Sequence, residues 1–171
     1  MQFNNSEKTS IESARKIALL LLDVDGVLTD GKLYFSNSGD EIKTFHTLDG
    51  HGIKMLMSAG IPVGIITGRV SEIVTKRAAD LGITILYQGR EDKLNVLQEI
   101  SKKHNIDLQH ICYAGDDLPD LPVLKAVGLS FSVPDAHSTV KDAVDIITAR
   151  AGGNGAVREI TDFLLDSQDR L

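Results

Sequence analysis

Short apolar segments alternate with amphipathic segments along most of this 171-residue chain. Unbroken apolar runs are typical of buried strands, and apolar residues at helical spacing are typical of helices that pack on a sheet. The predicted strands are 17–23, 62–66, 83–87, 110–114, 128–132 and 145–147. The predicted helices are 50–59, 71–81, 91–104, 118–126 and 155–166. This alternation predicts an α/β fold, a Rossmann-like parallel sheet with helices on both faces.

One segment departs from the alternation directly after the first strand. Residues 31–46 read GKLYFSNSGDEIKTFH, two strand-like runs around the turn-forming residues 37–40, and predict a β-hairpin where a helix would otherwise follow. We expect residues 1–16 to form a short helix or a loose arm. The length suits one domain, and no repeat or linker interrupts the chain. We therefore expect a single domain, 1–171, that ends in a tail over about 150–171.

Composition and charge narrow the classes of function. The chain has 18 Lys and Arg against 24 Asp and Glu, a net charge of −6, with no basic block. This balance argues against nucleic acid or an anionic membrane as the partner. No apolar run is long enough to span a bilayer, and residues 1–10 lack the basic and apolar parts of a signal peptide. The single cysteine, Cys112, allows no intrachain disulfide, so we expect a cytoplasmic protein.

Polar residues follow the predicted strands where each strand ends. Asp23 and Asp25 come directly after the four leucines of the first strand. In an open α/β sheet, ligands bind beyond the carboxyl ends of the strands, so residues at these ends are site candidates. The candidates are Asp23, Asp25, Thr67, Gly68, Arg69, Lys93, Asp116, Asp117 and Asp120.

These residue types suit phosphoryl chemistry with a divalent cation. A carboxylate cluster without cysteine or histidine favours Mg²⁺, which would also relieve the repulsion between Asp23 and Asp25. Thr67, the Gly68 amide and Lys93 offer donors for phosphate oxygens. Asp23 could act as a nucleophile on a bound phosphate. Asp25 could protonate the leaving alcohol and later take a proton from water.

The same motifs, in the same order, resemble those of the haloacid dehalogenase superfamily of phosphotransferases. The matching stretches are DVDGVLTDG, IITGR, Lys93 and GDDLPD. The resemblance implies that Asp23 is the nucleophile and Asp25 the general acid and base. It implies a Mg²⁺ site made by the Asp23 carboxylate, the Asp25 main-chain carbonyl and Asp116, with Thr67 and Lys93 on the phosphoryl group. The residues that would support the acidic cluster are Asp117 and Asp120.

Longer stretches resemble the small phosphatases of this superfamily that hydrolyse KDO 8-phosphate, a sugar acid of lipopolysaccharide biosynthesis. They include IITGRVSEIVTKRAADLGI, YAGDDLPDLPVL and AGGNGAVREITDFLL. Members of this group lack a separate cap domain and form homotetramers in which the hairpin lies beside a neighbour's site. The resemblance therefore implies a capless haloacid dehalogenase fold with a β-hairpin insertion, a homotetramer and a sugar-acid phosphate as substrate.

The choice of substrate depends on a few positions. Relatives that act on nine-carbon sialic-acid-type sugar 9-phosphates tend to carry Glu where this chain has Arg69, and Lys near its Asp80. Both differences favour the eight-carbon sugar. Arg69 and Arg77 are eight residues apart on a helical pattern and could bracket a sugar acid. Many relatives have arginine where this chain has Leu48, so any role of that arginine is absent or filled elsewhere.

Other functions stay open as alternatives. A signalling receiver domain also uses an acidic pocket, a threonine and a lysine, but its lysine comes last, whereas Lys93 precedes the second acidic cluster. A non-catalytic regulatory domain would not need the intact acid pair Asp23 and Asp25. A sugar-phosphate-binding module is a third alternative, which a turnover assay would separate from an enzyme. The glycines at 152–155 are interpreted as a flexible loop, because no phosphate-loop lysine follows them.

Overall fold

The four consecutive leucines of β2 (Leu19–Leu22) lie inside a seven-stranded sheet of the computed structural model, which describes residues 1–171. The strand order is β1-β9-β8-β7-β2-β5-β6, and every pair is parallel except β1 with β9. The other strands are β1 (Gln2–Phe3), β5 (Val63–Ile66), β6 (Ile85–Tyr87), β7 (Ile111–Ala114), β8 (Leu129–Ser132) and β9 (Ile146–Ile147). The six predicted strands are confirmed, each with slightly shorter bounds.

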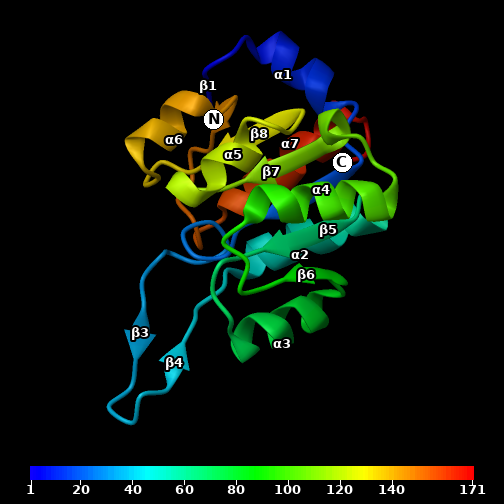
Figure 1. Ribbon diagram of the computed structural model, residues 1–171. Coiled ribbons are helices and arrows are strands. Elements are labelled where there is room, and N and C mark those ends of the chain that lie inside the picture. Colours follow the sequence, from blue (N-terminus) through cyan, green and yellow to red (C-terminus); the bar gives the residue numbers. More distant parts are fainter.

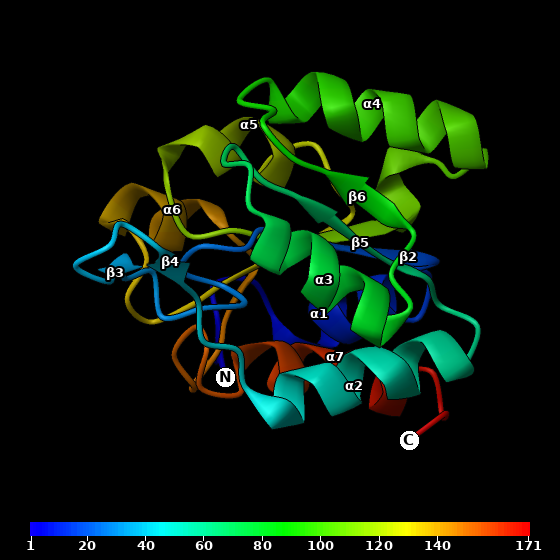
Figure 2. The same ribbon diagram turned by 90° about the horizontal axis from the view of Figure 1, so that it is seen from below.

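Helices cover both faces of this sheet (Figures 1 and 2). One face packs against α1 (Glu7–Ala14), α2 (Thr47–Ser58), α3 (Glu72–Leu81) and α7 (Ala156–Ser167). The other packs against α4 (Lys93–His104), α5 (Leu121–Leu124) and α6 (Ser138–Ala143). Leu20 and Leu22 belong to the first core and Leu19 and Leu21 to the second, because successive side chains of a strand point to opposite faces. The Rossmann-like α/β architecture is confirmed.

A few elements differ from the prediction. Strand β1 and helix α6 were not expected, and the helix predicted at 118–126 is divided into a 3₁₀ turn η2 (Leu118–Asp120) and α5. A second 3₁₀ turn, η1 (Leu108–His110), precedes β7. Pro119 and Pro122 explain the division, since proline lacks an N–H donor and is tolerated only in the first turn of a helix. None of the helices is both long enough and apolar enough to cross a membrane.

The predicted hairpin is present and projects from the body of the molecule (Figure 1). Its strands, β3 (Tyr34–Phe35) and β4 (Glu41–Ile42), pair in antiparallel register. Leu33, Phe35 and Ile42 are 50%, 60% and 51% exposed. An isolated two-stranded hairpin is marginal in water, and clustered exposed apolar side chains are typical of a surface that contacts a partner.

Candidate active site

The carboxyl ends of the central strands open into one polar pocket of about 650 Å³. None of its lining residues is hydrophobic. They are Asp23, Asp25, Gly31, Thr67, Gly68, Arg69, Glu91, Lys93, Asp116, Asp117, Pro119 and Asp120. The structure therefore brings every candidate predicted from the strand ends into one pocket.

Asp23 lies at the end of β2, where the main chain is still tied to the sheet. Its N–H donates to the Ala114 carbonyl at 3.0 Å, and its side chain is only 10% exposed. Burial, followed by the negative charge of Asp120, raises the pKa of Asp23 from 3.8 to about 7, against the opposing charge of Lys93. One lysine is thus not enough to neutralise this carboxylate, and the site calls for further positive charge.

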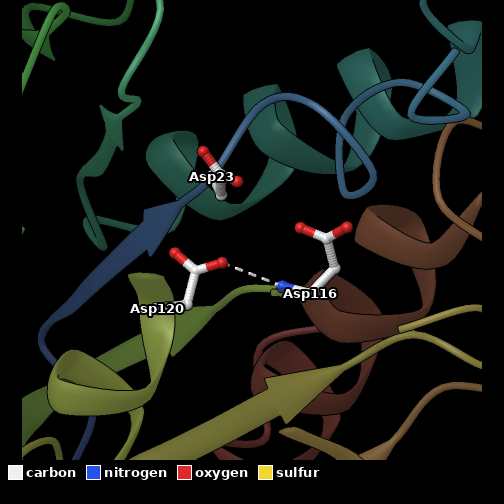
Figure 3. Close-up of side chains that lie close together, drawn as sticks. All are labelled: Asp23, Asp116 and Asp120. Carbon is white, nitrogen blue, oxygen red and sulfur yellow. Dashed lines mark hydrogen bonds between the residues drawn. The ribbon is translucent and has the colours of Figure 1, made fainter. Parts of the chain in front are cut away.

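Asp116 faces the same space from the loop after β7 (Figure 3). Burial raises its pKa to about 7, with the charges of Asp23 and Asp120 adding to the effect. The close approach depends on Gly26, which has φ +90° and whose missing Cβ would lie 2.0 Å from Oδ2 of Asp116. Any side chain at this position would displace the carboxylate, so the glycine of the DVDG motif has a direct structural reason.

Carboxylate oxygens of Asp23, Asp116 and Asp120 lie within 4.8 Å of one another and could together hold a metal ion. Both oxygens of Asp120, however, already accept hydrogen bonds. Oδ1 accepts from Lys93 Nζ and from Tyr113 Oη, each at 2.6 Å, and Oδ2 accepts from the N–H groups of Asp116 (3.1 Å) and Asp117 (3.2 Å). Since both oxygens of Asp120 are engaged in this way, the carboxylates of Asp23 and Asp116 are the ones available to a cation.

Lys93 extends into the pocket from the first turn of α4. Its side chain is 5% exposed, and Nζ lies 3.0 Å from Oδ1 of Asp23 and 2.6 Å from Oδ1 of Asp120. Burial alone would lower its pKa, but the charges of Asp23 and Asp120 outweigh burial and raise it. Lys93 is therefore a fixed cation beside the Asp23 carboxylate.

Thr67 and Gly68 occupy the loop after β5. The Thr67 N–H donates to the Tyr87 carbonyl at 2.9 Å, which extends the β5–β6 pairing by one residue and holds the Thr67 side chain at the pocket. A Cβ on Gly68 would lie 3.8 Å from Glu91 Cγ, an ordinary contact, so close packing does not require a glycine at this position.

The two candidate arginines are in different places. Arg69 lines the pocket and donates to Glu41 Oε1 at 2.6 Å. Arg77 is not among the lining residues. Its guanidinium lies over the Phe45 ring, 5.5 Å from the centroid, and would meet a Cβ on Gly50 at 2.4 Å. Within one chain the two arginines do not bracket a common pocket.

The sequence patterns did not predict Tyr113, Glu41 or Lys43 as part of the site, nor the lining residues Gly31, Glu91 and Pro119. Tyr113 looked like part of an apolar strand, and Glu41 and Lys43 looked like ordinary hairpin residues. The Lys43 ammonium group donates to Asp25 and lies 3.5 Å from Glu41. The available signal is the pair of opposite charges at i and i+2, Glu41 and Lys43, where β4 ends, since this spacing places both side chains on one side of an extended segment.

The glycines at 152–155 are close-packed, so their interpretation as a flexible loop was wrong. A Cβ on Gly152 would lie 1.8 Å from the Gly26 carbonyl oxygen, and one on Gly153 would lie 2.6 Å from the Asp30 nitrogen. The Gly153 N–H also donates to Val27 at 3.1 Å. This loop holds the turn that follows Asp23 and Asp25.

Comparison with known proteins points to one group. A family model for haloacid dehalogenase-like hydrolases matches residues 86–160. The chain is 48% identical over 161 residues to 3-deoxy-D-manno-octulosonate 8-phosphate phosphatase KdsC of Escherichia coli (strain K12), across 94% of this chain and 86% of that protein. It is similar to the crystal structure of a probable YrbI family phosphatase from Pseudomonas syringae pv. phaseolica 1448a (TM-score 0.95, 48% identity, 96% and 94% of the two chains). It is also similar to 3-deoxy-D-manno-octulosonate 8-phosphate phosphatase from Moraxella catarrhalis in complex with a magnesium ion, a phosphate ion and KDO (TM-score 0.94, 41% identity, 96% and 94%).

Proposed function

Because the chain belongs to the 3-deoxy-D-manno-octulosonate 8-phosphate (KDO 8-phosphate) phosphatase family of haloacid dehalogenase-like hydrolases, we propose that it hydrolyses KDO 8-phosphate to KDO and phosphate with the help of Mg²⁺. The observation that carries this proposal is the pocket itself. It combines two unneutralised carboxylates, a buried lysine and a threonine, with no apolar lining residue. That donor set suits a metal-bound phosphate and no apolar ligand.

The residues present fit Mg²⁺. Asp23 and Asp116 offer carboxylate oxygens, neither cysteine nor histidine lines the pocket, and the raised pKa values of both groups mark a deficit of positive charge. We assign these two carboxylates, with the Asp25 main-chain carbonyl, as the protein ligands. When bound, Mg²⁺ supplies positive charge that offsets the carboxylates and the phosphate oxygens.

The reaction proceeds in two steps that use the acid pair. A carboxylate oxygen of Asp23 attacks phosphorus and forms an aspartyl-phosphate, while the bond from phosphorus to the sugar oxygen breaks and that oxygen takes a proton from Asp25. Asp25 then takes a proton from a water molecule whose oxygen attacks phosphorus. The bond from phosphorus to the Asp23 oxygen breaks and phosphate leaves. Asp25 now carries the proton taken from water, as it did at the start of the reaction.

The remaining lining residues hold the transferring group. Thr67 Oγ1, the Gly68 amide and the Lys93 ammonium group donate to its oxygens. Since two carboxylates hold the Lys93 ammonium group in place, it does not have to move as charge develops on the phosphoryl oxygens. Asp120 fixes Lys93, and Asp117, whose N–H donates to Asp120, supports the same cluster.

The sugar-acid carboxylate needs a positive contact, and Arg69 is the arginine that lines the pocket. KDO in the Moraxella catarrhalis relative supports the eight-carbon substrate. Arg77 does not line the pocket of its own chain, so a contact with substrate would require a second subunit. A nine-carbon sugar-acid phosphate is the second candidate substrate.

We also infer a single-domain homotetramer that works in the cytoplasm. The exposed apolar side chains of the hairpin support self-association, because a neighbour would bury them. The lone cysteine is buried and unpaired, as expected in a reducing compartment.

Phosphate release tests the function directly. The purified protein is incubated with KDO 8-phosphate, with a nine-carbon sugar-acid phosphate and with glucose 6-phosphate, each with Mg²⁺ and with EDTA. We expect Mg²⁺-dependent release with the eight-carbon compound preferred. Equal turnover of all three compounds would refute the assignment of KDO 8-phosphate as the substrate. No turnover of any compound would favour a regulatory domain.

A further inference from the structure

A buried cation without a predicted role lies at the base of the hairpin. The Lys43 side chain is only 3% exposed, although lysine is rarely buried unless it is paired. Its ammonium group donates to Oδ1 of Asp25 and lies 3.5 Å from Oε1 of Glu41. Lys43 is not among the residues that line the pocket, so its nearest route to bound substrate is through Asp25.

A network of alternating charges fixes this contact. Glu41 Oε1 accepts from Arg69 Nη2 at 2.6 Å, and Glu41 Oε2 accepts from Ser71 Oγ at 2.9 Å. Arg69 Nε in turn lies 3.7 Å from Oδ2 of Asp25. Lys43 of the hairpin therefore contacts Oδ1 of Asp25, and Arg69 of the loop after β5 approaches Oδ2. Only the hairpin contact is a close one.

We propose that Lys43 is a positioning residue that orients the Asp25 carboxylate for proton transfer, an inference that rests on the proposed phosphatase function. Asp25 is 22% exposed and follows the strand end in a turn, where a side chain has rotational freedom unless something holds it. Proton transfer requires the donor oxygen within hydrogen-bond reach of the sugar oxygen as the phosphorus–oxygen bond breaks. The Lys43 contact removes the rotation that would carry Asp25 out of reach.

This role differs measurably from simple anchoring of the hairpin. A sugar alkoxide is a poor leaving group and needs the Asp25 proton, whereas p-nitrophenolate leaves without one. A lysine that only stabilised the hairpin would affect both substrates alike. A lysine that orients Asp25 affects the step that forms the aspartyl-phosphate from the sugar phosphate and largely spares the same step with p-nitrophenyl phosphate. The parameter kcat/KM reports the steps up to phosphoenzyme formation. Glucose 6-phosphate is measured beside the other two, because it has a sugar leaving group but lacks the carboxylate assigned to Arg69, and it should lose kcat/KM as KDO 8-phosphate does.

The experiment compares Lys43→Met and Lys43→Arg with the unchanged protein at saturating Mg²⁺. Lys32→Met is the matched control, since Lys32 is on the same hairpin and lies 3.8 Å from an aspartate, but is 73% exposed. We expect Lys43→Met to lower kcat/KM for KDO 8-phosphate by about ten-fold, a part of what general acid catalysis supplies, and to leave p-nitrophenyl phosphate within about two-fold. Lys43→Arg recovers most of the loss, and Lys32→Met matches the unchanged protein on both substrates.

Equal losses on both substrates, or no loss on KDO 8-phosphate, would overturn the inference, as would an arginine variant no better than methionine. If Lys43→Met does not fold, Lys43→Gln keeps a shorter, uncharged donor at the same position, and it should show the same substrate difference at smaller size. An unchanged protein that hydrolyses neither substrate would overturn the proposed function instead, and this inference with it.

Discussion

Asp116→Asn tests the charge balance of the site without substrate. In the metal-free protein the pKa of Asp116 is raised from 3.8 to about 7, chiefly by burial and then by Asp23 and Asp120. When the pKa of a carboxyl is higher in the folded than in the unfolded protein, the folded protein becomes less stable as the pH rises between the two values. At pH 8 the penalty has an upper limit of about 4 kcal/mol for a shift of this size at 1.36 kcal/mol per unit.

Partial exposure and coupling to Asp23 reduce the expected effect to about 2 kcal/mol. Replacing the charge with an amide of the same shape should therefore stabilise the metal-free protein at pH 8 by that amount, or about 4–8 °C in Tm for a chain of this size. The gain should shrink toward pH 5, where Asp116 is protonated in the folded protein. Added Mg²⁺ should raise the Tm of the unchanged protein at pH 8 and have little effect on Asp116→Asn.

Thermal unfolding in EDTA at pH 5 and pH 8, repeated with Mg²⁺, measures each part of this prediction. Asp80→Asn is the control, because Asp80 is an exposed aspartate of α3 outside the pocket. A metal-free Asp116→Asn protein that is no more stable than the unchanged protein at pH 8 would show that the Asp116 charge does not destabilise the fold. An undiminished response of that variant to Mg²⁺ would show that Asp116 does not bind the cation.

Four further substitutions test the nucleophile, the general acid and two buried hydrogen bonds. Asp23→Asn should abolish phosphate release while circular dichroism shows an intact fold, and substantial residual turnover would exclude Asp23 as nucleophile. Asp25→Ala should slow breakdown of the phosphoenzyme more than it weakens Mg²⁺ binding, since its proposed metal contact is main-chain; rapid quench and calorimetry compare the two. Tyr113→Phe removes a 2.6 Å hydrogen bond to the buried Asp120 and should cost about 1.5–3 kcal/mol in urea unfolding. Asp49 is 1% exposed and accepts a hydrogen bond from the Arg158 N–H at 2.8 Å near the start of α7. Asp49→Ala should therefore lower the free energy of unfolding by about 1–3 kcal/mol and leave kcat unchanged. A variant as stable as the unchanged protein would show that this contact is dispensable.

Much of the fold could be predicted because its central strands are apolar throughout. Leu19–Leu22 and the runs that pair with it are buried on both faces, and the helices between them show one apolar stripe each. Strand β1 and helix α6 escaped prediction, since two and six residues are too few to show a period.

The site could be predicted as far as the strand-end rule reaches. That rule is enough to predict that Asp23, Lys93 and Asp116 lie together. It could not find the Lys43–Asp25 contact, which joins the hairpin to the turn after β2, or the Tyr113–Asp120 bond beneath the cluster. Both depend on where side chains of separate elements meet, and residue order alone does not specify that.

The most direct test of the central claim is phosphate release from KDO 8-phosphate by the unchanged protein, with Mg²⁺ and with EDTA, beside Asp23→Asn. We expect rapid release with Mg²⁺, none in EDTA and none from the variant. Release that persists in EDTA, or in Asp23→Asn, would contradict a Mg²⁺-dependent reaction through an aspartyl-phosphate.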